Sequence, residues 1–363
     1  MSYLLDSDST AASPGRVCRS ESVGIALVGA GIVANLHARG ILHCPNARLV
    51  GVLDTDERRA SLLAEKFDGR CYGSLSELLD DPAVQAVHVL TPVKAHVEVG
   101  EACLAAGRHV LVEKPVAGTV AEIERLAQAA HKTELYCVPG HNYIHQPSIR
   151  RMRRLLQEGA FGTVGSLWVL FNILHDEATA AIYGGVLRAV CVHHAYSLLY
   201  LLGRPESVVA TASSVHYERL TCEDQVMITA SMPNGAIANL WASFVADDPS
   251  NDPWTVTYKL IGTKGVSTFS WADAVFTDGG GPAWGLTNYV ESFEAEIDYF
   301  VNRCIRGGEP PLSSLQDAAD ALRIVQACEA SLRSGSRTTI DWNNKVKTAS
   351  DATAPRDIPT VMA

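Results

Sequence analysis

The sequence lacks an apolar run long enough to cross a membrane, since no stretch approaches the roughly 18 apolar residues that a spanning helix needs. Its opening residues carry neither the basic start nor the long apolar core of a secretory signal. Positive charge is in the minority, with 30 Lys and Arg against 40 Asp and Glu and a formal net charge of −10. These features argue against membrane and nucleic-acid partners. We therefore expect a cytoplasmic protein.

Paired cysteine motifs are also absent. The nine Cys residues are scattered, odd in number and without a C-x-x-C pair. A disulfide framework or a structural zinc site needs thiols at paired, regular spacings. The sequence therefore predicts reduced thiols and no bound metal.

What the sequence contains is enough length for about two domains, 363 residues with 47% hydrophobic composition. Residues 1–22 and 344–363 have no apolar pattern, and we expect both to be mobile tails. Between residues 23 and 142, short apolar runs alternate with amphipathic stretches, which is typical of a parallel sheet wrapped by helices. The predicted strands are 23–29, 48–54, 86–92, 109–115 and 135–140. The predicted helices lie near 33–43, 57–66, 95–106 and 119–132.

The pattern changes in residues 143–343. A helix is predicted at 147–159, and the runs that follow alternate apolar and polar residues, as strands with one buried face do. These runs are 163–174, 207–215, 225–232 and 236–245. The pattern predicts an α+β domain with a large, mostly antiparallel sheet that is open on one face and covered by helices on the other. Helices at 287–306 and 314–333 should pack back on the body.

The first predicted strand ends in a glycine-rich turn, Gly29-Ala30-Gly31-Ile32-Val33. Glycines there permit a tight turn and close approach of a pyrophosphate, which the next helix binds through its N-terminal N–H groups. Asp54, at the end of the second strand, could accept hydrogen bonds from ribose hydroxyls and would repel a 2′-phosphate. These residues predict a Rossmann dinucleotide-binding domain over residues 23–142, with NAD favoured over NADP. A capping role for Asp54 is the alternative, although Asp56 could serve as well.

The run "HVLVEKPVAG" ends an apolar strand on Glu113-Lys114-Pro115. Taken alone, Lys114 is either a solvated strand end or a placed cation. Ligands of open α/β sheets bind beyond the carboxyl ends of the strands, so a bound dinucleotide would bring the nicotinamide to this turn. A Lys there can bond the oxygen of an alcohol, stabilise its developing charge and relay a proton. The other residues expected on this cofactor floor are Thr91, Pro92, His96 and Glu113.

Taken together, the motifs resemble the Gfo/Idh/MocA family, named for glucose-fructose oxidoreductase, inositol dehydrogenase and a rhizopine-catabolism protein. The resemblance runs from about Val23 to Trp342. Besides the glycine turn, it rests on "VLTPVKAH", "VLVEKPVAG", "GHNYIHQP", "GGVLRAVCVHHAYSLLYLLG", "NGAIANLWASF", "IGTKG" and "YVESFEAEIDYF". It implies a Rossmann domain, a second domain whose open sheet often makes dimer or tetramer contacts, and hydride transfer between NAD(P) and a secondary alcohol of a sugar or cyclitol.

The sequence departs from the family motif G-G-x-L-x-D-x-G-x-H in the stretch that begins at Gly184. His193 falls on the motif His, but Ala189 stands where the motif has Asp, and Cys191 replaces its Gly. Tyr196 stands where a further Asp is common. On one continuous helix, positions 189, 193 and 196 would share a face. The sequence therefore predicts an altered active site.

The resemblance makes Lys114 and His193 the catalytic pair that handles the hydroxyl proton, whereas His194 is expected to be structural. The substrate pocket should draw on the segments 171–185 and 139–147. The predicted substrate-binding residues are His141, Asn142, Tyr143, His175, Tyr183, Ala189 and Tyr196.

Three functions remain open at this point. The leading one is an NAD(P)-dependent dehydrogenase or reductase of a sugar, cyclitol or sugar derivative, in a homodimer or homotetramer. The second is an enzyme that oxidises a glycoside transiently, eliminates a neighbouring bond and returns the hydride, with no net redox change. The third is a binding protein that has lost its chemistry with the motif Asp, against which the intact Lys114 and His193 argue.

Overall fold

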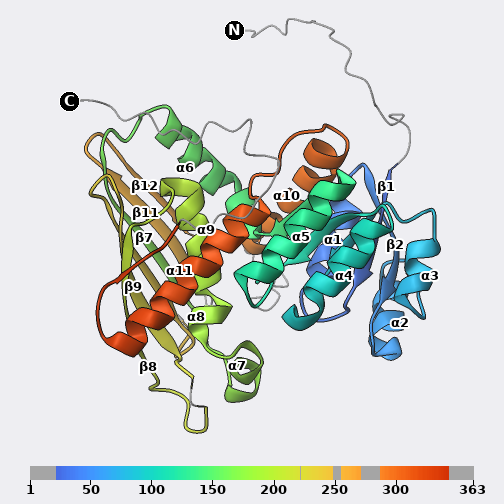
Figure 1. Cartoon of the computed structure of the whole chain (residues 1–363), viewed down its shortest axis with the longest axis horizontal. Coiled ribbons are helices and arrows are strands. Elements are labelled where there is room, and N and C mark those ends of the chain that lie inside the picture. The colour runs from blue at the N-terminus through green and yellow to red at the C-terminus, as the bar shows by residue number, and fades with distance from the viewer. Residues whose placement is uncertain (1–21, 221, 248–254, 271–286, 343–363) are drawn as a thin grey trace, which may run out of the picture.

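The computed structural model describes residues 22–220, 222–247, 255–270 and 287–342. Two β-sheets, each with its own helices, lie side by side in this part of the chain (Figure 1). The predicted tails 1–22 and 344–363 lie outside the described residues, apart from Ser22. No helix in these ranges is both long and apolar enough to span a bilayer.

The first sheet is parallel throughout, with the strand order β3-β2-β1-β4-β5-β6. Its strands are β1 (Val23–Val28), β2 (Ala47–Leu53), β3 (Arg70–Cys71), β4 (Ala86–Val89), β5 (His109–Glu113) and β6 (Cys137–Gly140). Its helices are α1 (Ala34–His43), α2 (Glu57–Lys66), α3 (Leu75–Asp80), α4 (Val93–Ala105) and α5 (Val120–Thr133). Both β1 and β4 are buried along their whole length because helices cover both faces of the sheet. The strand order reverses between β1 and β4, where a ligand crevice is expected in such a sheet.

The second sheet has the order β12-β11-β7-β10-β9-β8-β13 and one parallel pair, β7 with β10. Its strands are β7 (Val164–Asn172), β8 (Ser207–Ser213), β9 (Gln225–Ser231), β10 (Ile237–Ser243), β11 (Thr255–Gly262), β12 (Val266–Ser270) and β13 (Thr338–Thr339). The remaining pairs are antiparallel. The predicted fold class, a Rossmann-type parallel sheet followed by a large and mostly antiparallel one, is confirmed.

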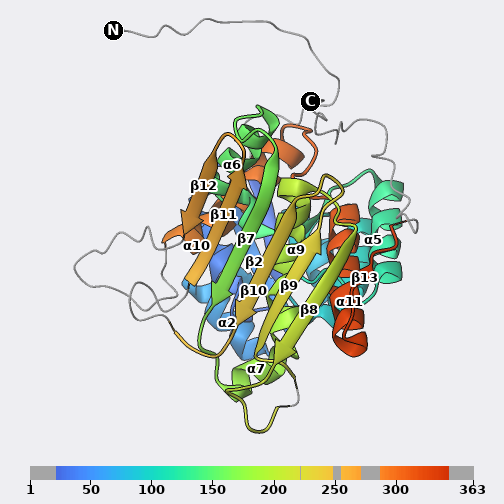
Figure 2. The same cartoon turned by 90° about the vertical axis from the view of Figure 1, so that its left-hand side faces the viewer.

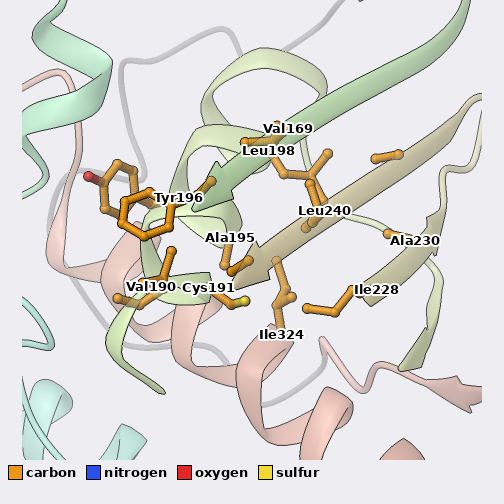
Figure 3. Close-up of a cluster of buried hydrophobic side chains, with 14 of the residues drawn as sticks. Val169, Val190, Cys191, Ala195, Tyr196, Leu198, Ile228, Ala230, Leu240 and Ile324 are labelled. Carbon is orange, nitrogen blue, oxygen red and sulfur yellow. The ribbon is translucent and has the colours of Figure 1, made fainter. Parts of the chain in front are cut away.

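The two faces of the second sheet differ as the alternating sequence predicts. Along β7, Leu167, Val169 and Phe171 are buried, whereas Trp168 and Leu170 are exposed. The buried face packs against α8 (Val186–Ala189), α9 (Cys191–Leu202) and α11 (Leu315–Ser334). Figure 3 shows part of this core, in which side chains of α9 and α11 meet those of β7, β9 and β10. No described helix covers the other face, which Figure 2 presents to the viewer.

The late helices join the two sheets. Helix α10 (Thr287–Asp298) packs on α1 and continues as a π-helix, Tyr299–Ile305. Helix α11 contacts α5 on one side and α9 and β8 on the other. Both were predicted, but the short elements β3 and α3 were not, because two and six residues are too few to establish a period. The remaining elements are η1 (Asn142–His145), α6 (Pro147–Gln157) and α7 (Glu177–Tyr183).

Candidate active site

A cleft of about 230 Å³ lies where the carboxyl ends of β4 and β5 face the end of β7 and the start of α9. The first sheet contributes Thr91 and Lys114, and the second domain contributes Ala189 and His193. Predicted site residues on the wall are Ile32, Val33, Thr91, His96, Glu113, Lys114, Tyr143, His175, Ala189 and His193. The fold therefore brings Lys114 and His193, 79 positions apart in the sequence, to one cavity.

The glycine turn at the edge of this cleft has the geometry of an anion cradle. Gly29 has φ of +108°, and a Cβ there would lie 2.6 Å from backbone atoms of Leu90, so no other residue fits without strain. A Cβ at Gly31 would meet no described atom within 4 Å, so the space above the turn is open. Helix α1 begins directly afterwards, with no side-chain cap and no acidic residue in its first turn. This N-terminus fits a dinucleotide pyrophosphate.

Asp54 holds the same turn from the neighbouring strand. Its carboxylate accepts hydrogen bonds from the N–H of Ala30 at 2.7 Å and from Arg59 Nη2 at 3.0 Å. Burial tends to raise the pKa of Asp54, but these donors hold it below its usual value, so the group is a carboxylate. The cap of α2 is Asp56, which accepts from the N–H groups of Arg58 and Arg59. The N-cap of α2 is therefore Asp56, and Asp54 lies beside the glycine turn instead.

The end of β4 forms the floor of the cleft. Thr91 Oγ1 is buried and has no hydrogen-bond partner among the described residues, as expected of a group that bonds a ligand. The ring of His96 lies between the carbonyl oxygens of Thr91, at 2.6 Å, and Pro115, at 3.0 Å, and so joins this loop to the turn that carries Lys114. Pro92 was also expected on the floor, but it occupies the N-cap position of α4 and is not on the cleft wall.

Lys114 is half-buried, and its Nζ donates a hydrogen bond to the carbonyl oxygen of Ala189 at 3.4 Å. Burial lowers the pKa of Lys114, while the charge of Glu113 opposes that shift. Burial would likewise raise the pKa of Glu113, but His37, whose Nε2 lies 3.2 Å from Oε1, and the Lys114 charge hold it low. An ionised Glu113 therefore supports the cation of Lys114 from behind.

His193 faces Lys114 from α9. Its Nδ1 lies 2.6 Å from the hydroxyl of Tyr196, and its ring stacks on that of Tyr143 at a centroid distance of 4.1 Å. Burial lowers the pKa of His193 well below its usual value, and the charge of Lys114 lowers it further. The imidazole is therefore neutral and able to accept a proton.

Several predicted residues lie elsewhere than expected. The helix carrying the motif is interrupted at Val190, so Ala189 ends α8 while His193 and Tyr196 belong to α9. The three residues are therefore not on one continuous helix, although Ala189 and His193 both line the cleft. The three predicted residues that lie behind the cleft wall, fully buried, are His141, Asn142 and Tyr196.

The remaining residues expected in the pocket have different locations. His175 lines the cleft, and Tyr183 ends α7 with a side chain outside the described part of the structure. The ring of His194 is buried edge-on to Phe171, 6.4 Å between centroids, on the side of the hydrophobic core.

Sequence reasoning missed the apolar part of the wall. The unpredicted apolar residues that line it include Phe171, Ile173, Phe244, Tyr289 and Phe293. The first three lie at the ends of β7 and β10, and the last two belong to α10. Nothing in a strand-end Phe distinguishes a cavity wall from a core position, and only the tertiary packing of α10 against α1 brings Tyr289 and Phe293 to the cleft.

Known proteins match the chain in sequence and in structure. Residues 23–141 match the profile described as "Oxidoreductase family, NAD-binding Rossmann fold", and residues 149–268 match the Gfo/Idh/MocA C-terminal domain. Myo-inositol 2-dehydrogenase of Thermotoga maritima is 25% identical over 329 residues, covering 85% of this chain and 96% of its own. 1,5-Anhydro-D-fructose reductase of Ensifer adhaerens is 29% identical over 60% of this chain and 68% of its own. The crystal structure of GenD2 from gentamicin A biosynthesis in complex with NAD superposes with a TM-score of 0.79 and 26% identity, covering 91% of this chain and 100% of that one.

Proposed function

The chain belongs to the Gfo/Idh/MocA family of oxidoreductases, and we propose that it is an NAD-dependent dehydrogenase or reductase of a secondary alcohol on a sugar, cyclitol or sugar derivative. One observation carries the proposal: Lys114 and a neutral His193 come from different domains to one cleft whose edge is the glycine turn. A cation and a base at the same cavity are what removal of a hydroxyl proton requires.

The residues that would hold the dinucleotide are the glycine turn, Asp54 and Thr91, with Ile32 and Val33 on the cleft wall. When bound, the nicotinamide supplies the acceptor or donor of hydride. Lys114 donates a hydrogen bond to the substrate oxygen and stabilises its developing negative charge. His193 takes the hydroxyl proton in the oxidation direction and returns it in reduction. The apolar wall excludes water from the reacting carbon.

Relatives support the substrate class. The protein named myo-inositol 2-dehydrogenase aligns over most of this chain, and the anhydrofructose reductase aligns over more than half of it. The structure with GenD2 contains NAD, which supports NAD as the cofactor here. The test is the absorbance of reduced nicotinamide while cyclitols, sugars and glycosides are added with NAD or NADH. A change with any member supports a net dehydrogenase, product without net NADH supports transient oxidation, and bound cofactor without product contradicts both.

Asp54→Asn should weaken the preference for NAD over NADP by about tenfold. The amide oxygen can still accept the Ala30 N–H, but the charge that repels a 2′-phosphate disappears and Arg59 loses its partner at 3.0 Å. The dissociation constants of the two cofactors, measured by calorimetry, check this. Asp56→Asn is the control, since Asp56 caps α2 and also pairs with Arg59, at 3.3 Å, so it removes an Arg59 partner while keeping Asp54. An unchanged preference in Asp54→Asn would contradict the assignment.

Ala189→Asp should raise kcat/KM for simple cyclitols or aldoses by about tenfold, because it restores the motif carboxylate near Lys114. The backbone of residue 189 already lies 3.4 Å from Lys114 Nζ, so a carboxylate there has a cation within reach. The control is Ala189→Asn, which has the same shape without the charge. Equal kcat/KM for wild type and both variants on every substrate would mean that the missing Asp does not define this site.

We further propose that the chain forms a homo-oligomer through the uncovered face of the second sheet. That face exposes Trp168 (51%), Met227 (54%) and Ile237 (46%), large apolar side chains that an interface would cover. Trp168→Lys combined with Met227→Lys should reduce the mass measured by light scattering to that of one 39.0 kDa chain. Leu62→Lys, an exposed apolar position on α2, is the control. An unchanged mass in the double variant would exclude this face.

A further inference from the structure

A buried chain of hydrogen bonds runs from His193 away from the cleft. His193 Nδ1 lies 2.6 Å from the Tyr196 hydroxyl, which lies 3.4 Å from Asn142 Oδ1. Asn142 Nδ2 donates to Ser292 Oγ at 2.9 Å, and Ser292 Oγ donates to the carbonyl oxygen of Tyr289 at 2.6 Å. Tyr196, Asn142 and Ser292 are only 0–2% exposed, so water does not compete for these hydrogen bonds.

The direction of every bond follows from its last member. A carbonyl oxygen can only accept, so the hydroxyl of Ser292 donates its one proton to the carbonyl oxygen of Tyr289 and accepts a hydrogen bond from Asn142. This orients the amide, with Nδ2 toward Ser292 and Oδ1 toward Tyr196. Because Oδ1 can only accept, its 3.4 Å contact with the Tyr196 hydroxyl is a hydrogen bond when the Tyr196 proton points at Asn142.

The hydroxyl of Tyr196 then has lone pairs and no proton left for His193. One lone pair accepts the backbone N–H of Tyr143 at 3.3 Å, and the other faces His193 Nδ1. The opposite arrangement, in which Tyr196 donates to His193, would place two proton-free oxygens of Tyr196 and Asn142 against each other in the core.

We propose that Tyr196, Asn142 and Ser292 are positioning residues that keep the proton of His193 on Nδ1 and leave the lone pair of Nε2 as the proton acceptor of the active site. Tyr196 therefore replaces, with a neutral hydroxyl, the carboxylate common at that position. It acts behind the base rather than on the substrate. The catalytic part of this inference rests on the proposed function, but the tautomer of His193 does not.

The tautomer can be measured directly. Long-range proton–nitrogen NMR correlations of the full chain labelled with ¹⁵N-histidine, with NAD added, distinguish a ring protonated at Nδ1 from one protonated at Nε2. The His193 signals are identified by their loss in His193→Gln. We expect the Nδ1-protonated form at pH 7.5. A ring protonated at Nε2 or on both nitrogens would overturn the inference, whatever the enzyme activity proves to be.

Tyr196→Phe tests the same chain through kinetics. It should lower kcat by about 10- to 100-fold with a small change in KM, since the base is misoriented while the cleft wall stays intact. Its His193 signals should no longer show a single Nδ1-protonated form. The control is Tyr258→Phe, which removes another buried hydroxyl, bonded to Ser197 of the same helix at 3.0 Å. Equal losses of kcat in the two variants, with the His193 tautomer unchanged in both, would mean that Tyr196 is only a core residue. A wild type with the expected tautomer but no activity would leave the inference intact and overturn the proposed function.

Discussion

Replacing Lys114 with Ala is expected to lower kcat by about 10²- to 10⁴-fold while the affinity for NAD stays within a few-fold of wild type. Its Nζ is the cation on the cleft wall that faces His193, and burial lowers its pKa while the charge of Glu113 opposes that shift. The predicted cofactor cradle, from Gly29 to Val33 with Asp54, does not depend on it. Single-turnover kinetics and a titration with NAD separate the two quantities.

Two matched variants sharpen this result. Lys114→Arg keeps a cation but replaces the compact ammonium with a guanidinium that stays charged, so it should recover charge stabilisation and not proton relay. Activity close to wild type in Lys114→Arg would show that the charge alone matters. Lys94→Ala removes an exposed Lys from the first turn of α4, off the cleft wall, and should leave kcat unchanged. If Lys114→Ala retained full turnover, Lys114 would be a solvated strand end after all.

The sequence predicts the architecture well where burial imposes a period. The strands of the parallel sheet are uninterrupted apolar runs because both faces are covered, and β7 alternates because one face is bare. The glycine turn could also be predicted, because the structure requires glycine there. Gly29 has a positive φ and lies close to the backbone of Leu90, and other residues do not tolerate either condition.

The interior of the site could be predicted only in part. Lys114 and His193 are recognisable by motif, but the break at Val190 separates Ala189 from the helix that a periodic reading would extend through it. The role of Tyr196 depends on Ser292, 96 positions later in the chain, and on the carbonyl of Tyr289. A local sequence pattern cannot predict such a partner, because the contact with Ser292 arises from the packing of α10 against η1.

Buried histidines make the protein sensitive to acid, which is the second large effect that we expect. Burial lowers the pKa of His141, His145 and His194 to about 3 each, against a usual value of 6.5. Folded chains keep these rings neutral, whereas unfolded chains protonate them below pH 6.5. The contribution of these rings to the free energy of unfolding is therefore full above pH 6.5 and is lost as the pH drops toward 3.

At pH 5 each ring should lower the free energy of unfolding by about 2 kcal/mol, and the three together by about 6 kcal/mol. This is a large part of the roughly 5–15 kcal/mol that stabilises a folded protein. Urea unfolding at pH 7.5 and at pH 5 measures the loss. His194→Leu should recover about 2 kcal/mol of it, because neither ring nitrogen of His194 has a hydrogen-bond partner among the described residues. His131→Gln, exposed on α5, is the control and should recover nothing. Equal losses of stability between pH 7.5 and pH 5 in wild type and His194→Leu would mean that the ring of His194 is not held neutral by burial.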